Sequence, residues 1–324
     1  MTASVAVARH TVVRPKRLGS PENAARARNA ERVVAACGLA LVCCALATGR
    51  GAALEKAPTA RAVPEPHPSI SSGLPWDGRL KRAVRLKVSP ILHPIAKCAP
   101  RGNFYGTSEL VSLLERSAQA IAGRWPGSEL SVGELSAANG GKLDGHHSHR
   151  SGRDADVAFF MRDEQGRAAS FWRFVAFSIE GTALHVQRVL HFDDARNWAL
   201  VSTMLRDQEA RVQYMFVAQP LRTRLLMEGR RQAESEDFLR AAAAVLVEPK
   251  EGQKHDSHFH VRIYCARDDR PECRDSAPYW PWYDGSPPDG QRAELPTIDW
   301  RMPSMPAPQS APQVQRASTD PRSI

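Results

Sequence analysis

Two short windows of the chain hold most of the residues that could do metal chemistry. Six of the eleven histidines fall within residues 146–149 and 255–260. Aspartates flank the first window at 144, 154 and 156, and the second window contains Asp256. Imidazole nitrogen together with carboxylate oxygen is the ligand set of a catalytic zinc ion, which takes three protein ligands and keeps a fourth position for water. We therefore interpret His149, Asp156 and His260 as the ligands of a zinc ion.

The alternation of side chains along a strand separates these residues from apolar ones. In HFHVRI, which starts at His258, the two histidines and the arginine share one face and the apolar residues share the other. In DADVAF, which starts at Asp154, both aspartates share a face in the same way. Each strand is thus predicted to have a buried face and a working face. A turn through Gly152 would return His149 to the start of the strand that carries Asp156.

Several members of the cluster have a second interpretation. Any one of the histidines, taken alone, is more simply a solvated loop residue. As a set they would repel one another or stay desolvated unless a metal ion or partner compensates them. His146 is either a further ligand or a residue that supports one, because metal sites recruit such outer partners. Arg262 could bind a substrate carboxylate, although surface ion pairing is the commoner role of such an arginine.

Hydrophobic periodicity predicts the elements that must position these residues. Apolar residues at spacings of three and four predict a helix from Thr107 to Trp125, and another is predicted to begin near Asp193 or Asp194. Strands are expected at 129–136, 154–161, 212–220 and 258–265, and two further helices at 220–231 and 235–246. Because helices and short strands do not alternate regularly, the sequence predicts an α+β domain with a largely antiparallel central sheet and flanking helices.

The two ends of the chain differ in composition from its middle. Residues 33–47 are an uninterrupted apolar run behind a basic segment, which is the layout of a secretory signal and is short for a membrane span. Residues 1–48 are therefore predicted to be a signal peptide or an N-terminal anchor, both of which imply export. Proline-rich composition predicts a linker at 49–90 and a disordered tail at 284–324, which leaves 91–283 as the folded domain.

The net charge of +9 raises the question of nucleic acid. Residues 1–32 carry seven basic residues against two acidic ones, so five of the nine positive charges would leave with a cleaved signal. The remaining domain is only mildly basic. We therefore expect no nucleic-acid partner, and membrane contact only through the N-terminal segment if it stays uncleaved.

Half of the six cysteines, Cys37, Cys43 and Cys44, lie in the apolar run. Of the other three, Cys265 and Cys273 are close enough in sequence to close a short loop with a disulfide, which export would permit. Cys98 has no evident partner, so it is either a free thiol or part of an intermolecular bond.

The histidine windows resemble those of a known family. GGKLDGHHSHRSGRDADV followed by KHDSHFHVRIYC is similar to the penicillin-insensitive murein endopeptidases, metallopeptidases related to the D-Ala-D-Ala metallopeptidases, lysostaphin-type enzymes and the hedgehog domain. The shared pattern is His-x6-Asp followed by His-x-His, and the resemblance covers roughly residues 90 to 275. It implies a hedgehog/DD-peptidase-like fold in which His149, Asp156 and His260 bind Zn²⁺, with catalysis by His258 and assistance from His255.

The resemblance also implies an activity and a location. The expected reaction is cleavage of peptidoglycan peptide cross-links, of the D-alanyl–meso-diaminopimelyl type, by metal-activated water without an acyl-enzyme, in the periplasm or cell envelope. The alternatives are a D-Ala-D-Ala carboxypeptidase of the same fold and a zinc-retaining, non-catalytic envelope-binding module. His258 and His255 beside a complete set of ligands argue against the binding module, because a purely structural zinc closes its fourth position with protein.

Overall fold

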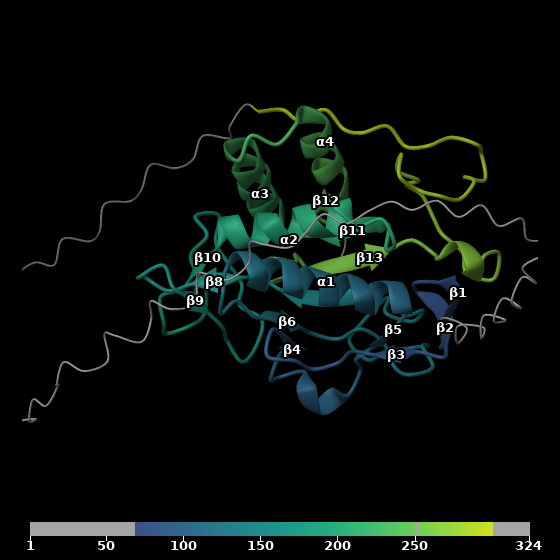
Figure 1. The fold of residues 1–324 in the computed structure, drawn as a ribbon, viewed down its shortest axis with the longest axis horizontal. Coiled ribbons are helices and arrows are strands. Elements are labelled where there is room, and N and C mark those ends of the chain that lie inside the picture. The colour runs from purple at the N-terminus through teal and green to yellow at the C-terminus, as the bar shows by residue number, and fades with distance from the viewer. Residues whose placement is uncertain (1–68, 250–251, 301–324) are drawn as a thin grey trace, which may run out of the picture. The chain divides into compact units, whose positions relative to one another are not determined.

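The structure, a computed structural model, describes residues 69–249 and 252–300 (Figure 1). The predicted signal or anchor at 1–48 lies outside the described residues. Within them, no helix has both the length and the apolar composition that crossing a membrane requires.

A six-stranded sheet forms the centre of the fold. The strand order is β12 (Leu246–Val247), β11 (Val212–Phe216), β13 (His258–Ile263), β7 (Asp154–Ala158), β6 (Leu130–Val132) and β4 (Leu92–Pro94). The three inner pairs are antiparallel, and the two outer pairs are parallel. Together with the helices, this confirms the predicted α+β class and a largely antiparallel sheet.

Four helices accompany the sheet: α1 (Ser108–Arg124), α2 (Asp194–Arg206), α3 (Gln219–Arg231) and α4 (Glu236–Val245). Three of them begin at a polar N-cap, whose side-chain oxygen accepts a hydrogen bond from a backbone N–H of the first turn. These caps are Thr107 on α1, Asp193 on α2 and Ser235 on α4. The predicted helix starts near Thr107 and Asp193 are therefore confirmed.

One hydrophobic core joins the helices to the sheet. The apolar face of β7 and β13 contributes Val157, Phe259 and Val261, all fully buried, and it packs with the apolar sides of α1 and α2. On α3, Gly229 gives room to the indole of Trp198, because a Cβ atom at Gly229 would lie only 2.4 Å from that ring. The opposite face of β7 and β13 stays free of this packing and carries the polar residues.

Strands occupy part of the stretch that the sequence assigns to the linker. β1 (Ile70–Leu74) and β2 (Asp77–Lys81) form an antiparallel hairpin, and β3 (Val84–Arg85) pairs with β5 (Tyr105–Gly106). Leu80 of the hairpin is buried against Gly152, where a Cβ atom would lie 2.7 Å from the Leu80 side chain. Prolines on both sides of so short a pattern hide it from a periodicity analysis. The hairpin supports the turn that leads into β7.

Smaller elements complete the described chain. β8 (Met161–Arg162), β9 (Ala168–Ala169) and β10 (His191–Phe192) form a three-stranded sheet, and the 3₁₀ turns are η1 (Ala99–Arg101) and η2 (Arg267–Asp269). Residues 284–300, which the sequence assigns to the tail, run beside the core and place Leu295 and Ile298 against it. Arg240 of α4 donates to the carbonyl oxygens of Leu295 and Pro296. An irregular segment of this kind shows no period that sequence analysis can detect.

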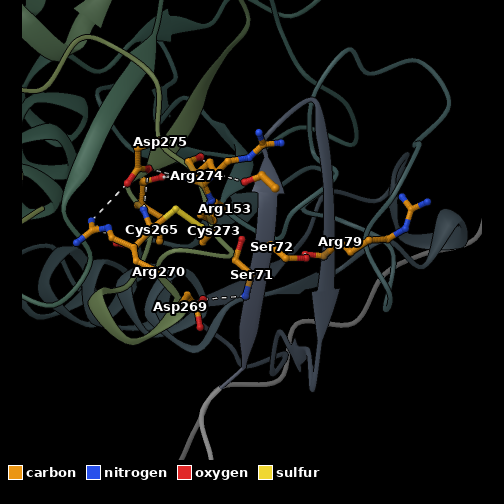
Figure 2. Close-up of a disulfide and its surroundings, with 12 residues drawn as sticks. Ser71, Ser72, Arg79, Arg153, Cys265, Asp269, Arg270, Cys273, Arg274 and Asp275 are labelled. Carbon is orange, nitrogen blue, oxygen red and sulfur yellow. Dashed lines mark hydrogen bonds and ion pairs between the residues drawn. A yellow bond between two sulfur atoms is a disulfide. The ribbon is translucent and has the colours of Figure 1, made fainter. Parts of the chain in front are cut away.

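The predicted disulfide between Cys265 and Cys273 is present (Figure 2). It closes a loop that contains η2. Within this loop, Asp269 accepts a hydrogen bond of 2.7 Å from the backbone N–H of Ser71 on β1. The loop therefore fastens the N-terminal hairpin to the end of β13. Cys98 is a half-buried free thiol.

A buried ion pair lies beside the disulfide (Figure 2). Arg153, directly before β7, donates to Asp275 at 2.8 Å, and both side chains are 1 % exposed. The Arg153 guanidinium also donates to the carbonyl oxygen of Arg274 at 3.0 Å. These bonds hold the start of β7, and so the strand that carries Asp154 and Asp156, against the segment after the disulfide.

Candidate metal centre

Four imidazoles converge on the carboxylate of Asp156. Nε2 of His149 and Nδ1 of His260 each lie 3.3 Å from its Oδ1 atom, and Nε2 of His258 lies 3.6 Å from the same atom. Nδ1 of His146 lies 3.8 Å from Oδ2. Residues separated by more than a hundred positions in sequence thus meet at one carboxylate.

Strand register explains half of this arrangement. In the antiparallel pair β13–β7, His260 stands directly opposite Asp156, and Arg262 stands opposite Asp154. On the other side of β13, Phe216 of β11 is opposite His260. Side chains that are opposed across a ladder have Cβ atoms about 4.5–5.5 Å apart. The polar face predicted from alternation is therefore a continuous surface that crosses three strands.

His149 reaches the centre through the turn before β7. Its backbone has a φ of 65°, a left-handed conformation that residues other than glycine rarely adopt, and Gly152 has a φ of 76°. The backbone N–H of His149 donates to Asp154, and its Nδ1 donates to the carbonyl oxygen of Leu135. With its proton on Nδ1, the fully buried ring directs the lone pair of Nε2 toward Asp156.

Two buried atoms at this point have no hydrogen-bond partner among the described residues, namely Nε2 of His149 and Oδ1 of Asp156. Leaving buried polar atoms unpaired costs free energy, and native structures rarely tolerate it without a reason. One ligand atom from each of His146, His149 and Asp156 lies within 4.8 Å of the others. A cation would satisfy both unpaired atoms at once, so these residues fit a metal ion.

Asp154 lies beneath this group and is completely buried. It accepts hydrogen bonds from Nε of Arg262 at 2.6 Å and from Nε2 of His260 at 2.9 Å. Burial opposes its ionisation, but the charge of Arg262 and the bond from His260 hold the pKa of Asp154 below its ordinary value. An ionised Asp154 therefore fixes the ring of His260 with Nδ1 toward Asp156.

The imidazole of His260 lies between the carboxylates of Asp154 and Asp156, and their negative charge affects its pKa. Burial alone would disfavour a charged ring, but the hydrogen bond with Asp154 and the nearby carboxylate of Asp156 raise the pKa of His260 to about 9. For Asp156, burial is likewise outweighed, and electrostatic interaction with the imidazoles of His149 and His258 holds its pKa well below the usual range. A bound cation would take the place of the proton on His260.

The imidazole of His258 is uncharged at neutral pH. Burial lowers the pKa of His258 to about 4, although Asp156 opposes this shift. Its Nδ1 and the hydroxyl of Ser257 are hydrogen-bonded at 3.1 Å, and its ring stacks on Phe174 with a centroid separation of 4.4 Å. The ring is therefore held in place with Nε2 facing Asp156.

His255 flanks the same group. Its ring centroid lies 5.2 Å from that of His258 and 5.8 Å from that of His260. Nδ1 donates to the carbonyl oxygen of Gln253 at 2.7 Å, and burial lowers the pKa of the ring. His255 thus presents a neutral Nε2 near the centre.

Sequence reasoning did not identify Glu134. This carboxylate is 2 % exposed and accepts hydrogen bonds from Nε2 of His146 at 3.1 Å and from Asn103 at 2.6 Å, besides an ion pair with Arg101. Its backbone carbonyl accepts from the N–H of Asp156. The signal is a single charged residue in the otherwise uncharged stretch LSVGELS, which the sequence predicts to be part of a strand. The strand ends at Val132 instead, and Glu134 turns toward the histidines.

The structure brings together five of the residues singled out in sequence: His146, His149, Asp156, His258 and His260. His255 is adjacent to them. Arg262 is 7 % exposed and donates to Asp154, so its guanidinium takes part in a buried ion pair. The substrate-binding role expected for Arg262 stays a prediction.

The chain is similar to known proteins. A family model described as penicillin-insensitive murein endopeptidase matches residues 78–323. A protein of Haemophilus influenzae (strain ATCC 51907 / DSM 11121 / KW20 / Rd) named penicillin-insensitive murein endopeptidase is 29% identical over 184 residues, which are 55% of this chain and 57% of that relative. The chain thus matches little more than half of the relative's length. The family match contains every residue of the candidate metal centre.

Proposed function

Because the chain belongs to the penicillin-insensitive murein endopeptidase family, we propose that it is a zinc-dependent endopeptidase that cleaves peptidoglycan cross-links of the D-alanyl–meso-diaminopimelyl type. The observation that carries this proposal is the convergence of imidazoles on Asp156, where Nε2 of His149 and Oδ1 of Asp156 are buried without a hydrogen-bond partner. The hedgehog/DD-peptidase-like fold belongs to the same proposal. So does a location in the periplasm or cell envelope, because peptidoglycan lies outside the cytoplasm.

The proposed metal ligands are His149, Asp156 and His260, with His146 as a further one. A zinc ion held there would lower the pKa of a bound water to about 7 and polarise the carbonyl group of the scissile bond. The protein's part is to orient these ligands. The Leu135 carbonyl does this for His149, and Asp154 does it for His260.

His258 is the proposed general base. At neutral pH its ring is uncharged, because burial places its pKa at about 4. It can therefore accept a proton at Nε2 from the attacking water and pass it to the amine that leaves. General acid–base catalysis of this kind contributes about 10² to 10⁴ in rate. His255 is proposed to assist by presenting its neutral Nε2 beside His258.

This mechanism uses no serine nucleophile, so a β-lactam has nothing to acylate. The chain should cleave its substrate equally well in the presence of penicillin. That property follows from catalysis by water and distinguishes the proposal from an acyl-enzyme mechanism.

The deciding experiment is mass spectrometry of muropeptides after incubation of cross-linked dimers with the purified protein. We expect monomers, no cleavage in the presence of a chelator, and recovered cleavage when zinc is restored. His258→Ala is the matched variant, because it keeps the proposed ligands.

The alternatives give different products. Release of terminal D-Ala alone would favour a carboxypeptidase of the same fold. Intact dimers together with retained zinc would favour a non-catalytic envelope-binding module. Cleavage that persists in the metal-free protein would exclude the proposed mechanism.

A further inference from the structure

A tryptophan that is exposed to solvent lies two positions before Phe174, whose ring stacks on the proposed base His258. Trp172 is 55 % exposed. Several large hydrophobic side chains are exposed in residues 69–249 and 252–300, and Trp172 is the one aromatic residue among them. The centroids of the Phe174 and His258 rings are 4.4 Å apart. Two residues span at most about 7 Å of chain, so the backbone of Trp172 lies within about that distance of the backbone of Phe174.

Contacts of both the backbone and the ring hold the segment that carries the indole. The carbonyl oxygen of Trp172 accepts a hydrogen bond of 2.8 Å from the backbone N–H of Lys97. The guanidinium of Arg173 lies 5.7 Å from the centre of the indole and 5.5 Å from that of Phe171, and it donates to the carbonyl of His185 at 2.8 Å. A loop that simply failed to bury a hydrophobic residue would not need these bonds. The arrangement presents a pre-ordered aromatic surface, which lowers the cost of binding a ligand.

The chemistry of the surface restricts what could bind there. An aromatic ring offers a flat apolar face, and a pyranose ring has an apolar C–H face that stacks on it while its hydroxyl groups remain in water. Lys97, whose backbone bonds to that of Trp172, is exposed, and the Arg173 guanidinium beside the indole adds a second positive charge. These charges complement the carboxylates of peptidoglycan stem peptides, which lie next to the sugar.

We infer that Trp172 is a binding site for the amino-sugar rings of the peptidoglycan glycan strand. The inference rests on the proposed function, and it adds a second part of the substrate to the peptide cross-link. In a cross-linked stem, three or four residues separate the scissile bond from the sugar, which is at most roughly 10 to 14 Å when extended. A sugar can therefore reach the segment that carries Trp172 while the cross-link occupies the metal centre.

The test compares two substrates that differ only in the glycan. One is a cross-linked muropeptide dimer that keeps its disaccharides, and the other is the same peptide dimer after an amidase has removed them. For Trp172→Ala we expect kcat/KM on the first substrate to fall roughly tenfold through KM, the size of one aromatic stacking contact, and kcat/KM on the second to stay within about twofold. Trp172→Phe should retain most of the activity on both. Val189→Ala, which alters another exposed hydrophobic side chain, is the control and should change neither.

A binding measurement keeps the inference independent of catalysis. Calorimetric titration with a disaccharide tetrapeptide monomer, which has no cross-link, should give a Kd roughly tenfold weaker for Trp172→Ala than for the wild-type protein. Equal losses on both dimers, or an unchanged Kd for the monomer, would overturn the glycan site. A wild-type protein that binds the monomer through Trp172 but cleaves neither dimer would instead refute the proposed function and leave the glycan site supported.

Discussion

His260 and Asp156 stand directly opposite each other in the antiparallel β13–β7 pair, and Nδ1 of His260 lies 3.3 Å from Oδ1 of Asp156. A rigid sheet therefore sets the spacing of these two proposed ligands. His149 comes from a turn, and its orientation depends on one hydrogen bond to a carbonyl group. The centre therefore combines His260 and Asp156, which the sheet fixes, with His149, which the turn before β7 must hold in position.

Replacing His149 by Ala should abolish tight zinc binding, because the remaining donors no longer enclose the position beside Asp156. Zinc at 1,000 times its Kd should stabilise the wild-type fold by about 4 kcal/mol, which raises Tm, and should leave Tm of the variant unchanged. Thermal unfolding with and without zinc measures this difference. His147→Ala, an exposed histidine in the same window, should behave as wild type. Equal stabilisation of both variants by zinc would contradict the assignment.

Replacing Glu134 by Gln should weaken zinc affinity about 10- to 100-fold, because the carboxylate that holds Nε2 of His146 loses its charge. Competition against a chromophoric chelator measures the affinity. Glu129→Gln is a matched control, since Glu129 also bonds a histidine, His93, at 3.1 Å but on the surface. An unchanged affinity in Glu134→Gln would mean that His146 is not a ligand.

Replacing His258 by Ala should lower kcat by about 10² to 10⁴ while zinc content stays at the wild-type level. The expected result separates the proposed base from the ligands around it. Rates come from the cleavage of muropeptide dimers, and metal content comes from elemental analysis of the same samples. If zinc and activity disappear together, His258 is a ligand and the proposed division of roles is wrong.

Replacing Arg153 by Met should destabilise the fold by about 3 kcal/mol, because the buried Asp275 loses its ion pair at 2.8 Å and keeps only the more distant one with Arg270, at 3.4 Å (Figure 2). Urea unfolding measures the change in the free energy of unfolding. Adding Asp275→Leu should recover part of the loss, since the poorly compensated buried carboxylate is then removed. Arg206→Met breaks an exposed pair with Glu234 and should cost under about 1 kcal/mol. Equal costs for Arg153→Met and Arg206→Met would refute this reading.

Stability should decrease in acid partly through Asp207. Burial opposes the charge of this carboxylate, but hydrogen bonds from Arg116 and from the backbone of Ala210 hold its pKa below the usual value. A group whose pKa is lower in the folded state stabilises the fold above its unfolded pKa of about 3.9 and loses that contribution as pH falls through the folded pKa. Tm should therefore fall as the pH drops below about 4, and less steeply in Asp207→Asn. Glu164→Gln, an exposed carboxylate, should leave the slope unchanged.

Sequence patterns predicted those elements well that depend on interactions between residues close together in the chain. Alternation in HFHVRI and DADVAF identified the polar face of β13 and β7, and the side-chain oxygens of Thr107 and Asp193 marked two helix starts. The hairpin at 70–81 escaped notice, because its strands are short and gain their stability from contact with distant residues. The same reason explains why residues 284–300 looked like a tail.

The candidate site divides in the same way. Residue type and spacing identified the histidines and Asp156 as a set, because imidazole and carboxylate are the groups that bind zinc. Only the tertiary structure placed Glu134 on His146 and Asp154 on His260, since those contacts depend on strand register and on a turn with a left-handed residue at His149. A sequence by itself determined the chemistry available to this protein. The fold decided which nitrogen of each ring faces Asp156, because that choice is made by hydrogen bonds between residues that are far apart in the chain.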